Sequence, residues 1–567
     1  MTKDLAAEDD LSQKTVPSDL KTRLQQAFEH HQRGRLEQAR AGYEQILFEQ
    51  PQHADALHLL GVVALQTQNY SQAVEWIVKA IQVNPKAPAF HANLGCALHE
   101  LKQYKAALVS HDQAIKLKPD YADAHSNRGD TCLKLKQWQA ALESYDKVIH
   151  LRPDHAQAHA NRGVALRRLG QWMGALESYD TAIRLAPNEA GAYNRRGNVQ
   201  KDLMQLEAAL ASYNQAIALD PNFANAYFNK SLLLLLMGDF AQGWPLYEWR
   251  WTQEPLLAAK PRLTQPLWLG DVSIQGKTIW LYAEQGLGDT LQFCRYVQWV
   301  ADLGARVVLT VPQPLLALLR GMDGVTELHQ EGQPLPVFDY HCPLMSLPLA
   351  FKTQRGTIPS YSSYLSCDPE LVQRWSQRLG VKTKPRVGLV WRGSARHNDD
   401  RSRSLELAHL LAYLPADIDY VSLQKEVRHA DQATLQAHPG IRHLGDQLGD
   451  FADTAAVCAL MDVVISVDTS VAHLSAALGR PTWVLLSYVP DWRWLLARED
   501  SPWYPSAKLY RQTQHRAWAE VLAQVRADLT GLFKSVSDAQ KTAPHASDAR
   551  HSGRLPARFR LEPPPSC

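Results

Sequence analysis

The chain has 567 residues, enough for several domains with separate cores, and its 45% hydrophobic and 21% charged content is that of an ordinary soluble globular protein. Its formal net charge of +2 gives no electrostatic reason to expect a nucleic acid or an anionic membrane as partner. No stretch reaches the roughly 18 apolar residues of a membrane span, the seven cysteines form no CxxC pair, and the acidic N-terminus is not a signal peptide. We therefore expect free thiols and a cytoplasmic location.

Residues 20–255, which follow a polar segment expected to be disordered (residues 1–19), repeat with a period of 34 residues. Each repeat ends in a proline, with small residues 24 and 12 positions before it and a large side chain 8 positions before it. The prolines are Pro51, Pro85, Pro119, Pro153, Pro187, Pro221 and Pro255. Small residues where two helices cross, and a proline that ends the second helix, are typical of a helical hairpin. This register predicts seven tetratricopeptide repeats, stacked as an all-α superhelix with a concave groove.

Four repeats carry an asparagine at the same position of their first helix. These residues are Asn93, Asn127, Asn161 and Asn229, and Arg195 interrupts the series. An amide ladder along the groove could hydrogen-bond the backbone of an extended peptide whatever its sequence. The alternative is that the amides serve contacts between neighbouring repeats. The repeats predict a module that binds a protein or peptide and carries no chemistry.

The second helix of the seventh repeat contains Trp244, Trp249 and Trp251. A terminal repeat needs a cap or a partner surface. We interpret the three tryptophans as a seam that docks the superhelix onto the following region, with a carbohydrate-stacking platform as the alternative.

From Trp268 onward, short β-branched stretches alternate with helical ones, which is typical of parallel, doubly wound sheets. The expected strands are Thr278–Ala283, Arg306–Val311, Val337–His341, Arg386–Trp391, Tyr420–Leu423, Val463–Val467 and Thr482–Leu486. A break near residues 380–384 divides this part into two Rossmann-like domains, 256–382 and 383–533, with a cleft between the carboxyl ends of their strands. Residues 534–567 are rich in Pro, Ser and Arg, and we expect them to be disordered.

The first of these domains contains a strand, a turn with Gly286 and Gly288, and a helix that opens at Asp289. Ligands bind at such turns in open α/β sheets, and the glycines let a ligand approach the backbone. A carboxylate fixed there is a candidate general base. The alternative is that Asp289 only caps its helix.

The second domain contains SVDTSVAHLSAALGRPTWVLL, in which a strand ends at Val467 and a hydroxyl-rich turn opens a helix. Asp468, Thr469 and Ser470 form this turn, and the free amides of the helix, the hydroxyls of Thr469 and Ser470 and the imidazole of His473 could cradle a diphosphate. For His473 alone, the alternative is a buried histidine with a structural role. The domain also begins with a strand that enters an arginine-rich loop, and its phosphate-donor candidates are Arg392, Arg396, Arg401 and Arg403.

Two of these motifs resemble a known family. GLGDT (286–290), and DTSVAH (468–473) followed by ALGRPT (477–482), resemble the ADP-heptose:lipopolysaccharide heptosyltransferases over roughly residues 275–530. The resemblance implies an inverting, metal-independent glycosyltransferase of the GT-B type. It implies that Asp289 is the base that deprotonates the acceptor, and that the 468–473 segment, with Gly288, contacts the donor. Where the family has two threonines and a lysine, this chain has Gly393-Ser394 and Arg403.

Repeats placed before a glycosyltransferase also resemble the architecture of the O-linked N-acetylglucosamine transferases, in which a superhelix recruits polypeptide acceptors. The sequence thus predicts a transferase that needs no cofactor or metal, with a nucleoside-diphosphate sugar, suggested by the resemblance to be ADP-linked, as co-substrate. The acceptor expected is a protein bound by the repeats. The alternative, from a different functional class, is a non-catalytic scaffold that binds partner peptides and carries a degenerate transferase domain.

Overall fold

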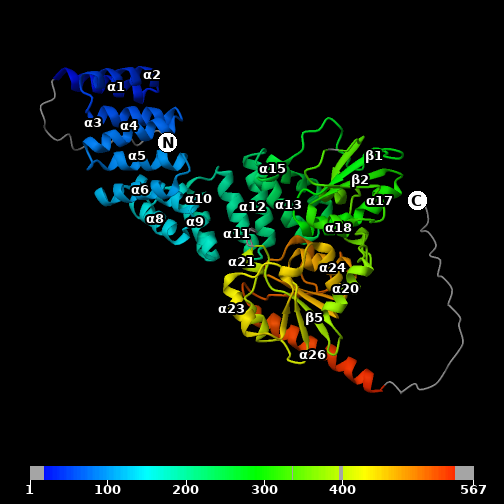
Figure 1. Cartoon of the computed structure of the whole chain (residues 1–567). Helices are drawn as coiled ribbons and strands as arrows, with labels where there is room; N and C mark the ends of the chain where they lie inside the picture. Colours follow the sequence, from blue (N-terminus) through cyan, green and yellow to red (C-terminus); the bar gives the residue numbers. More distant parts are fainter. Residues whose placement is uncertain (1–17, 335, 395–399, 543–567) are drawn as a thin grey trace, which may run out of the picture. The chain divides into compact units, whose positions relative to one another are not determined.

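The computed structural model describes residues 18–334, 336–394 and 400–542 (Figure 1). The residues divide into two compact units. One unit runs to Leu234 and takes in Pro245–Leu257, while the other contains Leu235–Trp244 and the chain from Ala258 on.

The repeats form a stack of helical hairpins, two helices to a repeat, which makes up the first unit apart from residues 235–244. The helices are α1 Ser18–Gln32, α2 Leu36–Glu49, α3 Ala54–Gln66, α4 Tyr70–Val83, α5 Pro88–Glu100, α6 Tyr104–Leu117, α7 Ala122–Lys134, α8 Trp138–Leu151, α9 Ala156–Leu169, α10 Trp172–Leu185, α11 Ala190–Asp202, α12 Leu206–Leu219, α13 Ala224–Met237 and α14 Phe240–Tyr247. In the first six repeats the second helix ends before the proline, as predicted. The seventh is different, because Pro245 lies inside α14 and a 3-10 turn, Glu248–Thr252, follows it.

The crossing points of the hairpins explain the regular spacing of small residues along the chain. A Cβ atom added to Gly163 of α9 would lie 2.7 Å from the ring of Tyr179 on α10, and the same holds for Gly129 and Tyr145. Tyr145 and Tyr179 are at most 1% exposed. A large ring thus fills the space that each glycine leaves, so that the two helices of a repeat pack closely.

The second unit contains two parallel sheets. Their strands are β1 Thr278–Tyr282, β2 Arg306–Val311, β3 Glu327–Gln330, β4 Tyr340–Pro343, β5 Arg386–Val390, β6 Asp419–Ser422, β7 Ile441–His443, β8 Val463–Val467, β9 Thr482–Leu486 and β10 Ala507–Arg511. The first sheet has the order β3-β2-β1-β4, and the second has the order β10-β9-β8-β5-β6-β7. In both, the strand order reverses beside the first strand, as in doubly wound nucleotide-binding folds.

The strand predictions were wrong at several sheet margins. β3, β7 and β10 lie at sheet edges and were not predicted: β3 and β7 bury at most one residue each, and β10 carries Lys508 and Arg511 among its buried residues. The strand expected at Val337–His341 begins at Tyr340 instead, since Val337 is 94% exposed and pairs with no strand.

Both faces of the second sheet are covered, which is why its strands are apolar throughout. Along β8, Val463 and Ile465 face one core and Val464 faces the other. The first core includes residues of α22 (Leu407–Leu411) and α26 (Trp518–Thr542), and the second includes residues of α20 (Pro369–Leu379) and α24 (Phe451–Ala459). Parallel sheets with helices on both faces show this pattern.

The last helix corrects one predicted boundary. α26 continues to Thr542, beyond the disorder expected from residue 534, because no proline interrupts the sequence before residue 544. The remaining tail and most of the N-terminal segment lie outside the described residues.

Candidate functional site

Asp289 is held at the start of α16 (Leu287–Phe293), directly after β1. The backbone N–H of Gly286, the N-cap residue, donates to Asp289 Oδ2 over 2.8 Å, which is the half of a capping box that an N3 carboxylate supplies. The capping alternative is therefore realised in the structure. Capping uses one carboxylate oxygen and fixes the orientation of the other.

The other oxygen, Oδ1, forms an ion pair with Nη2 of Arg493, which lies after β9 in a 3-10 turn, Trp492–Trp494. Nη1 of the same guanidinium donates to Asp491 Oδ1 over 2.7 Å. The Arg493 side chain is 8% exposed and the Asp289 side chain is 21% exposed. Since a carboxylate offers about four acceptor sites, Asp289 retains capacity for a further proton or hydrogen bond.

Arg493 is the residue that sequence reasoning missed. In the sequence, the surrounding segment VPDWRWL is distinguished by its aromatic residues and not by its arginine. The available signal was a charged residue between two tryptophans, shortly after the carboxyl end of a buried strand.

His473 lies inside α25 (Ser470–Ala477), after β8, and is 5% exposed. Its Nδ1 lies 2.9 Å from the hydroxyl of Tyr504, and its ring stacks on Trp494 with centroids 5.2 Å apart. Its Nε2 lies 3.8 Å from Asp468 Oδ1. Burial, with the nearby Arg493 guanidinium, lowers the pKa of His473 to about 3, so the ring is neutral near pH 7.

The residues before His473 form the turn. Thr469 is the N-cap residue of α25, and its hydroxyl lies 2.9 Å from the Ser466 hydroxyl. Burial and the nearby Asp491 raise the pKa of Asp468 to about 6. Ser470 begins the helix and remains partly exposed. The helix start thus offers amides and hydroxyls of the kind that bind anions.

The turns after β1 and β8 lie against each other. A Cβ atom added to Gly288 would lie 3.0 Å from Cδ2 of His473 and 3.5 Å from Cα of Ser470. Any larger residue than glycine would separate α16 from α25. The candidate base and the candidate phosphate cradle therefore belong to one site.

The loop after β5 reaches the same site, because β5 and β8 are neighbours and Val390 pairs with Ser466. Arg403 Nη1 donates to the carbonyl oxygen of Asp468 over 3.0 Å. Its guanidinium covers Gly393, where an added Cβ would lie 2.6 Å from Nη2. Among the described residues, the buried Nε of Arg403 has no acceptor, which leaves one N–H for a ligand. Ser394 is exposed.

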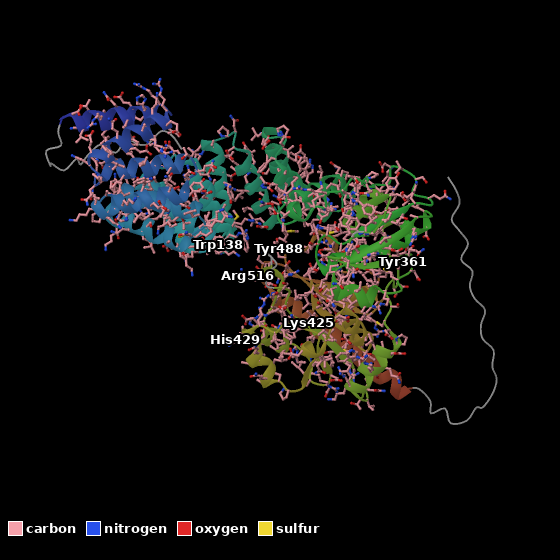
Figure 2. The ribbon with its side chains drawn as sticks, turned by 45° about the horizontal axis from the view of Figure 1, so that its top comes forward. Trp138, Tyr361, Lys425, His429, Tyr488 and Arg516 are labelled. Atoms are coloured by element: carbon pink, nitrogen blue, oxygen red, sulfur yellow. The ribbon has the colours of Figure 1, made fainter. Side chains whose placement is uncertain are left out.

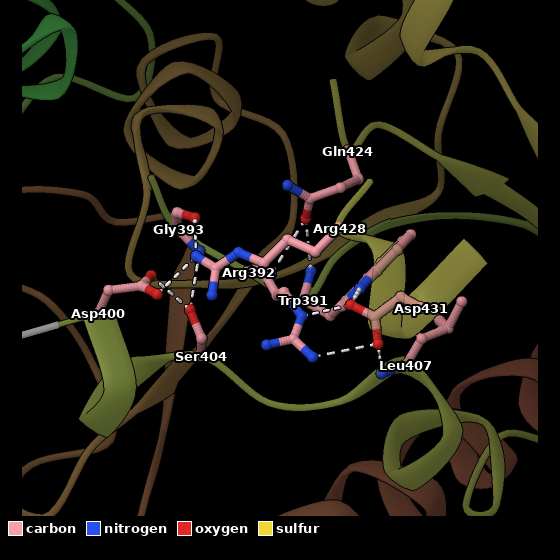
Figure 3. Close-up of polar contacts among 9 residues, drawn as sticks. All are labelled: Trp391, Arg392, Gly393, Asp400, Ser404, Leu407, Gln424, Arg428 and Asp431. Carbon is pink, nitrogen blue, oxygen red and sulfur yellow. Dashed lines mark hydrogen bonds and ion pairs between the residues drawn. The ribbon is translucent and has the colours of Figure 1, made fainter. Parts of the chain in front are cut away.

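Arg392 is not a phosphate donor in this structure. Its guanidinium forms an ion pair with Asp431, which also accepts from Trp391 Nε1 over 3.1 Å (Figure 3). Although burial opposes it, these bonds hold the pKa of Asp431 below its usual range. Of the other two arginine candidates, Arg396 and the side chain of Arg401 lie outside the described residues.

A second carboxylate fixes the loop that carries Ser394 and Arg403. Asp400 accepts from Ser404 Oγ over 2.7 Å and from Arg428 Nη2 over 2.5 Å, while Ser404 Oγ accepts from the N–H of Gly393 (Figure 3). Gly393 and Ser404 are thus joined to each other, and Asp400 connects this contact to Arg428.

In the repeats, each ladder asparagine donates to the preceding repeat. The contacts are Asn93 Nδ2 to His58 Nε2 at 2.8 Å, Asn127 Nδ2 to Cys96 Sγ at 3.2 Å, Asn161 Nδ2 to Asp130 Oδ1 at 2.9 Å, and Asn229 Nδ2 to Asn194 Oδ1 at 2.9 Å. The amides therefore serve contacts between neighbouring repeats, as the alternative interpretation holds. Because an amide has two N–H donors and a carbonyl oxygen, this use does not exhaust its capacity for a peptide.

The three tryptophans of the seventh repeat have separate surroundings. Trp244 Nε1 donates to the carbonyl oxygen of Thr353 over 3.0 Å, and its ring meets Trp492 edge to face, 5.3 Å between centroids. Trp249 instead stacks on Tyr227, 4.5 Å away. Trp251 is 7% exposed beside Arg250. Of the three, Trp244 belongs to the compact unit that contains the sheets, whereas the other two belong to the repeats.

A cavity of about 640 Å³ lies away from this site, lined by residues 270–275 together with Trp268, Leu303 and residues 350–352. Across the described ranges, no three His, Cys, Asp or Glu side chains are grouped so that they could hold a metal ion. No helix within those ranges has the length and apolar character needed to cross a membrane.

The first unit is a tetratricopeptide-repeat superhelix, a class of protein–protein interaction scaffold. Family models of the tetratricopeptide repeat match residues 24–88 and 129–190, and a second model, TPR repeat, matches residues 95–136 and 205–238.

Protein FlbA of Caulobacter vibrioides is 26% identical over 339 residues, which are 54% of this chain. The match spans 55% of that protein, about half of its length. Among solved structures, YrrB, described as a tetratricopeptide-repeat protein with an unusual peptide-binding site, is 20% identical, with a TM-score of 0.31 over 34% of this chain and 98% of its own. A tetratricopeptide repeat protein from Parabacteroides merdae is 14% identical, with a TM-score of 0.36 over 42% of this chain and 96% of its own.

Proposed function

We propose that the chain is an inverting, metal-independent glycosyltransferase with two Rossmann-like domains of the GT-B type. It transfers a sugar from a nucleoside diphosphate to a protein acceptor that the repeats recruit. The observation that carries the proposal is the meeting of two strand–helix turns at Gly288, which brings Asp289 of one sheet to the hydroxyl-rich turn and His473 of the other.

Inverting transfer needs a base on one side of the sugar and a sink for negative charge on the other. Asp289 takes the proton of the acceptor hydroxyl, whose oxygen then forms a bond to the anomeric carbon. The bond from that carbon to the diphosphate breaks, and its electron pair leaves with the diphosphate. The amides at the start of α25, the hydroxyls of Thr469 and Ser470, and Arg403 stabilise that charge.

One observation favours the scaffold alternative. Arg493 already neutralises the carboxylate of Asp289, and an ion-paired carboxylate of this kind also occurs where the charge is purely structural. In that case the repeats alone would carry the function, by binding partner polypeptides.

The two functions differ in nucleotide binding. The full chain is titrated by calorimetry with nucleoside diphosphates and nucleotide sugars, and proteins that co-purify with it are weighed by mass spectrometry after incubation with each nucleotide sugar. We expect one nucleotide sugar to bind both the wild type and Asp289→Asn within a few-fold, and only the wild type to add a sugar mass. Asp302→Asn, which replaces an exposed carboxylate of α17 (Val297–Asp302), is the matched control and retains transfer.

Transfer by Asp289→Asn at the wild-type rate would exclude the assigned base. A chain that binds none of the nucleotide sugars would be a scaffold.

A further inference from the structure

One contact between the fourth and fifth repeats has no counterpart between the fifth and sixth. Asp130 of α7 accepts a hydrogen bond from the Tyr145 hydroxyl over 2.7 Å and another from Asn161 Nδ2 over 2.9 Å. A single carboxylate thus joins a side chain of its own repeat to one of the next repeat.

One period of 34 residues later, the same three positions hold Val164, Tyr179 and Arg195. The tyrosine is retained and the asparagine is replaced by an arginine. The carboxylate of Asp130 is replaced by the isopropyl group of Val164. Tyr179 keeps the position of its counterpart, since its ring lies against Gly163 as the Tyr145 ring lies against Gly129. One repeat further on, an acceptor returns, because the Tyr213 hydroxyl donates to Asn198 Oδ1 over 2.9 Å.

Two polar groups are left without partners as a result. Tyr179 is 1% exposed, and no group in the described residues hydrogen-bonds to its hydroxyl. Arg195, which is partly exposed, has no hydrogen bond or ion pair within the same residues. The Tyr179 hydroxyl and the partly exposed Arg195 guanidinium, which receive no acceptor from the described residues, therefore remain available to an acceptor on a ligand.

Two further arginines lie near this position, and one of them, Arg167, is already paired with a carboxylate. Arg167 donates to Asp202 over 2.6 Å, and the Arg168 guanidinium lies 5.7 Å from the ring of Trp138, which Figure 2 labels. Burial raises the pKa of Tyr179 to about 12; Arg195, Arg167 and Arg168 oppose that rise, and Asp202 adds to it.

The surroundings fit an extended polypeptide better than a small anion. The first helices of neighbouring repeats, such as α7 with α9 and α9 with α11, contact one another as well as the second helices between them. They therefore line the inner side of the stack, along which an extended chain can lie.

We propose that an Asp or Glu side chain of an extended partner polypeptide binds to Tyr179 and Arg195, in the place that Asp130 occupies one repeat earlier. The proposal rests on the repeats as the acceptor-binding module of the proposed function, and it requires no sugar transfer. The neutral asparagines of the ladder form hydrogen bonds without selecting for charge. The position formed by Tyr179 and Arg195 instead selects for a negatively charged side chain.

A random dodecapeptide library displayed on phage and selected on the full chain tests this assignment. Fluorescein-labelled synthetic copies of the selected peptides then carry Glu, Gln or phosphoserine at the enriched position, and binding is followed by fluorescence anisotropy. We expect enrichment of Asp or Glu at one position, and about tenfold weaker binding of the Gln peptide, as for loss of a charge-assisted hydrogen bond.

Val164→Asp supplies the carboxylate from within the chain and should bind the Glu and Gln peptides equally, whereas the control Val164→Leu should retain the preference for Glu. Arg195→Asn restores the asparagine of the ladder. It should weaken binding of the Glu peptide and leave binding of the Gln peptide unchanged. Each of three results would overturn the proposal. The library could yield no acidic binders, or the Val164→Asp chain could still prefer the Glu peptide. The third is that the phosphoserine peptide binds and the Glu peptide does not.

A measurement without any peptide tests the geometry separately. At pH 7 the Val164→Asp chain should melt at a higher temperature than the Val164→Asn chain, whose side chain has the same shape as Asp but no charge. The reason is that the Asp carboxylate accepts hydrogen bonds from Tyr179 and Arg195. The opposite order would overturn the proposed geometry. Because no nucleotide sugar is present in either experiment, a chain that fails to transfer sugar but passes both tests would refute the proposed enzyme and leave the binding site intact.

Discussion

Arg493 and Asp289 form an ion pair although 204 residues separate them in the chain. The carboxylate follows the first strand of the first sheet, and the guanidinium follows the fifth strand of the second sheet. Arg493 is itself held by Asp491 and lies 4.3 Å from the ring of Trp492. The orientation of the proposed base therefore depends on a segment of the other sheet.

Arg493→Gln should lower the rate of sugar transfer about 10²-fold. Without Arg493 the Asp289 carboxylate is misplaced by about 1 Å and is no longer aligned with the acceptor hydroxyl. Nucleotide binding by calorimetry should change little, and Arg493→Lys should recover part of the rate. Transfer is measured as the mass added to a co-purified acceptor. Arg498→Gln is the control, since Arg498 pairs with the exposed Asp500 outside the site. Equal rates for the two Gln variants would contradict a positioning role.

Asp468→Asn should change the pH dependence of stability. The pKa of Asp468 is raised in the folded chain to about 6, from about 3.9 in an unfolded one, so its stabilising contribution is complete below pH 4 and is lost as the pH rises through 6. Above that pH the buried carboxylate costs up to about 3 kcal/mol. Relative to the wild type, the variant should therefore gain melting temperature between pH 4 and pH 7.

Thermal unfolding followed from pH 4 to pH 8 checks this expectation. Asp417→Asn is the control, because the Asp417 side chain is 99% exposed and should give no pH-dependent difference. A constant difference between Asp468→Asn and the wild type across the range would show that burial does not perturb this carboxylate.

A fragment of residues 256–542 should be less stable than one of residues 222–542. The shorter fragment lacks Phe240 and Trp244, which contact Trp503 and Trp492. Loss of a buried Trp side chain costs about 3–5 kcal/mol, so Trp244→Ala in the full chain should lower the melting temperature of the sheet-containing unit. Calorimetric scans of both fragments and the variant measure this effect.

Trp249→Ala provides the contrast, since Trp249 stacks on Tyr227 within the repeats. It should leave the transition of the sheet-containing unit unchanged. Identical melting of the two fragments would mean that the seventh repeat does not support the sheets.

Gly163→Ala and Gly174→Ala should shift stability in opposite directions. The new methyl at position 163 would lie 2.7 Å from the Tyr179 ring, and overpacking of this kind costs about 1–3 kcal/mol. At position 174 the nearest atom, on Leu166, is 3.5 Å away, so Ala should stabilise α10 by about 0.5–1 kcal/mol. Chemical denaturation of the two variants measures both effects, and a neutral Gly163→Ala would contradict close packing at the crossing.

The repeats could be predicted almost completely from the sequence because their contacts are local. Each repeat glycine meets a large side chain 16 residues away, Ile77 for Gly61 and a ring in the next four repeats, as with Gly129–Tyr145 and Gly163–Tyr179. Sequence spacing alone did not determine the binding partner of the asparagine ladder, because the same amide can hydrogen-bond a peptide or a neighbouring repeat. The contact of Asn161 with Asp130 shows that the neighbouring repeat uses it.

In the sheets, the sequence by itself determined the buried strands β1, β5, β8 and β9 and the turns after two of them, since apolar runs that end in glycine or hydroxyl residues have a local signature. It did not determine the polar edge strands or which turns meet. Only the tertiary structure decided that Gly288 lies against His473, that Arg392 is bound by Asp431 while Arg403 reaches Asp468, and that Arg493 pairs with Asp289. The physical reason is that these contacts depend on strand order and on the packing of distant segments, which no spacing along the chain encodes.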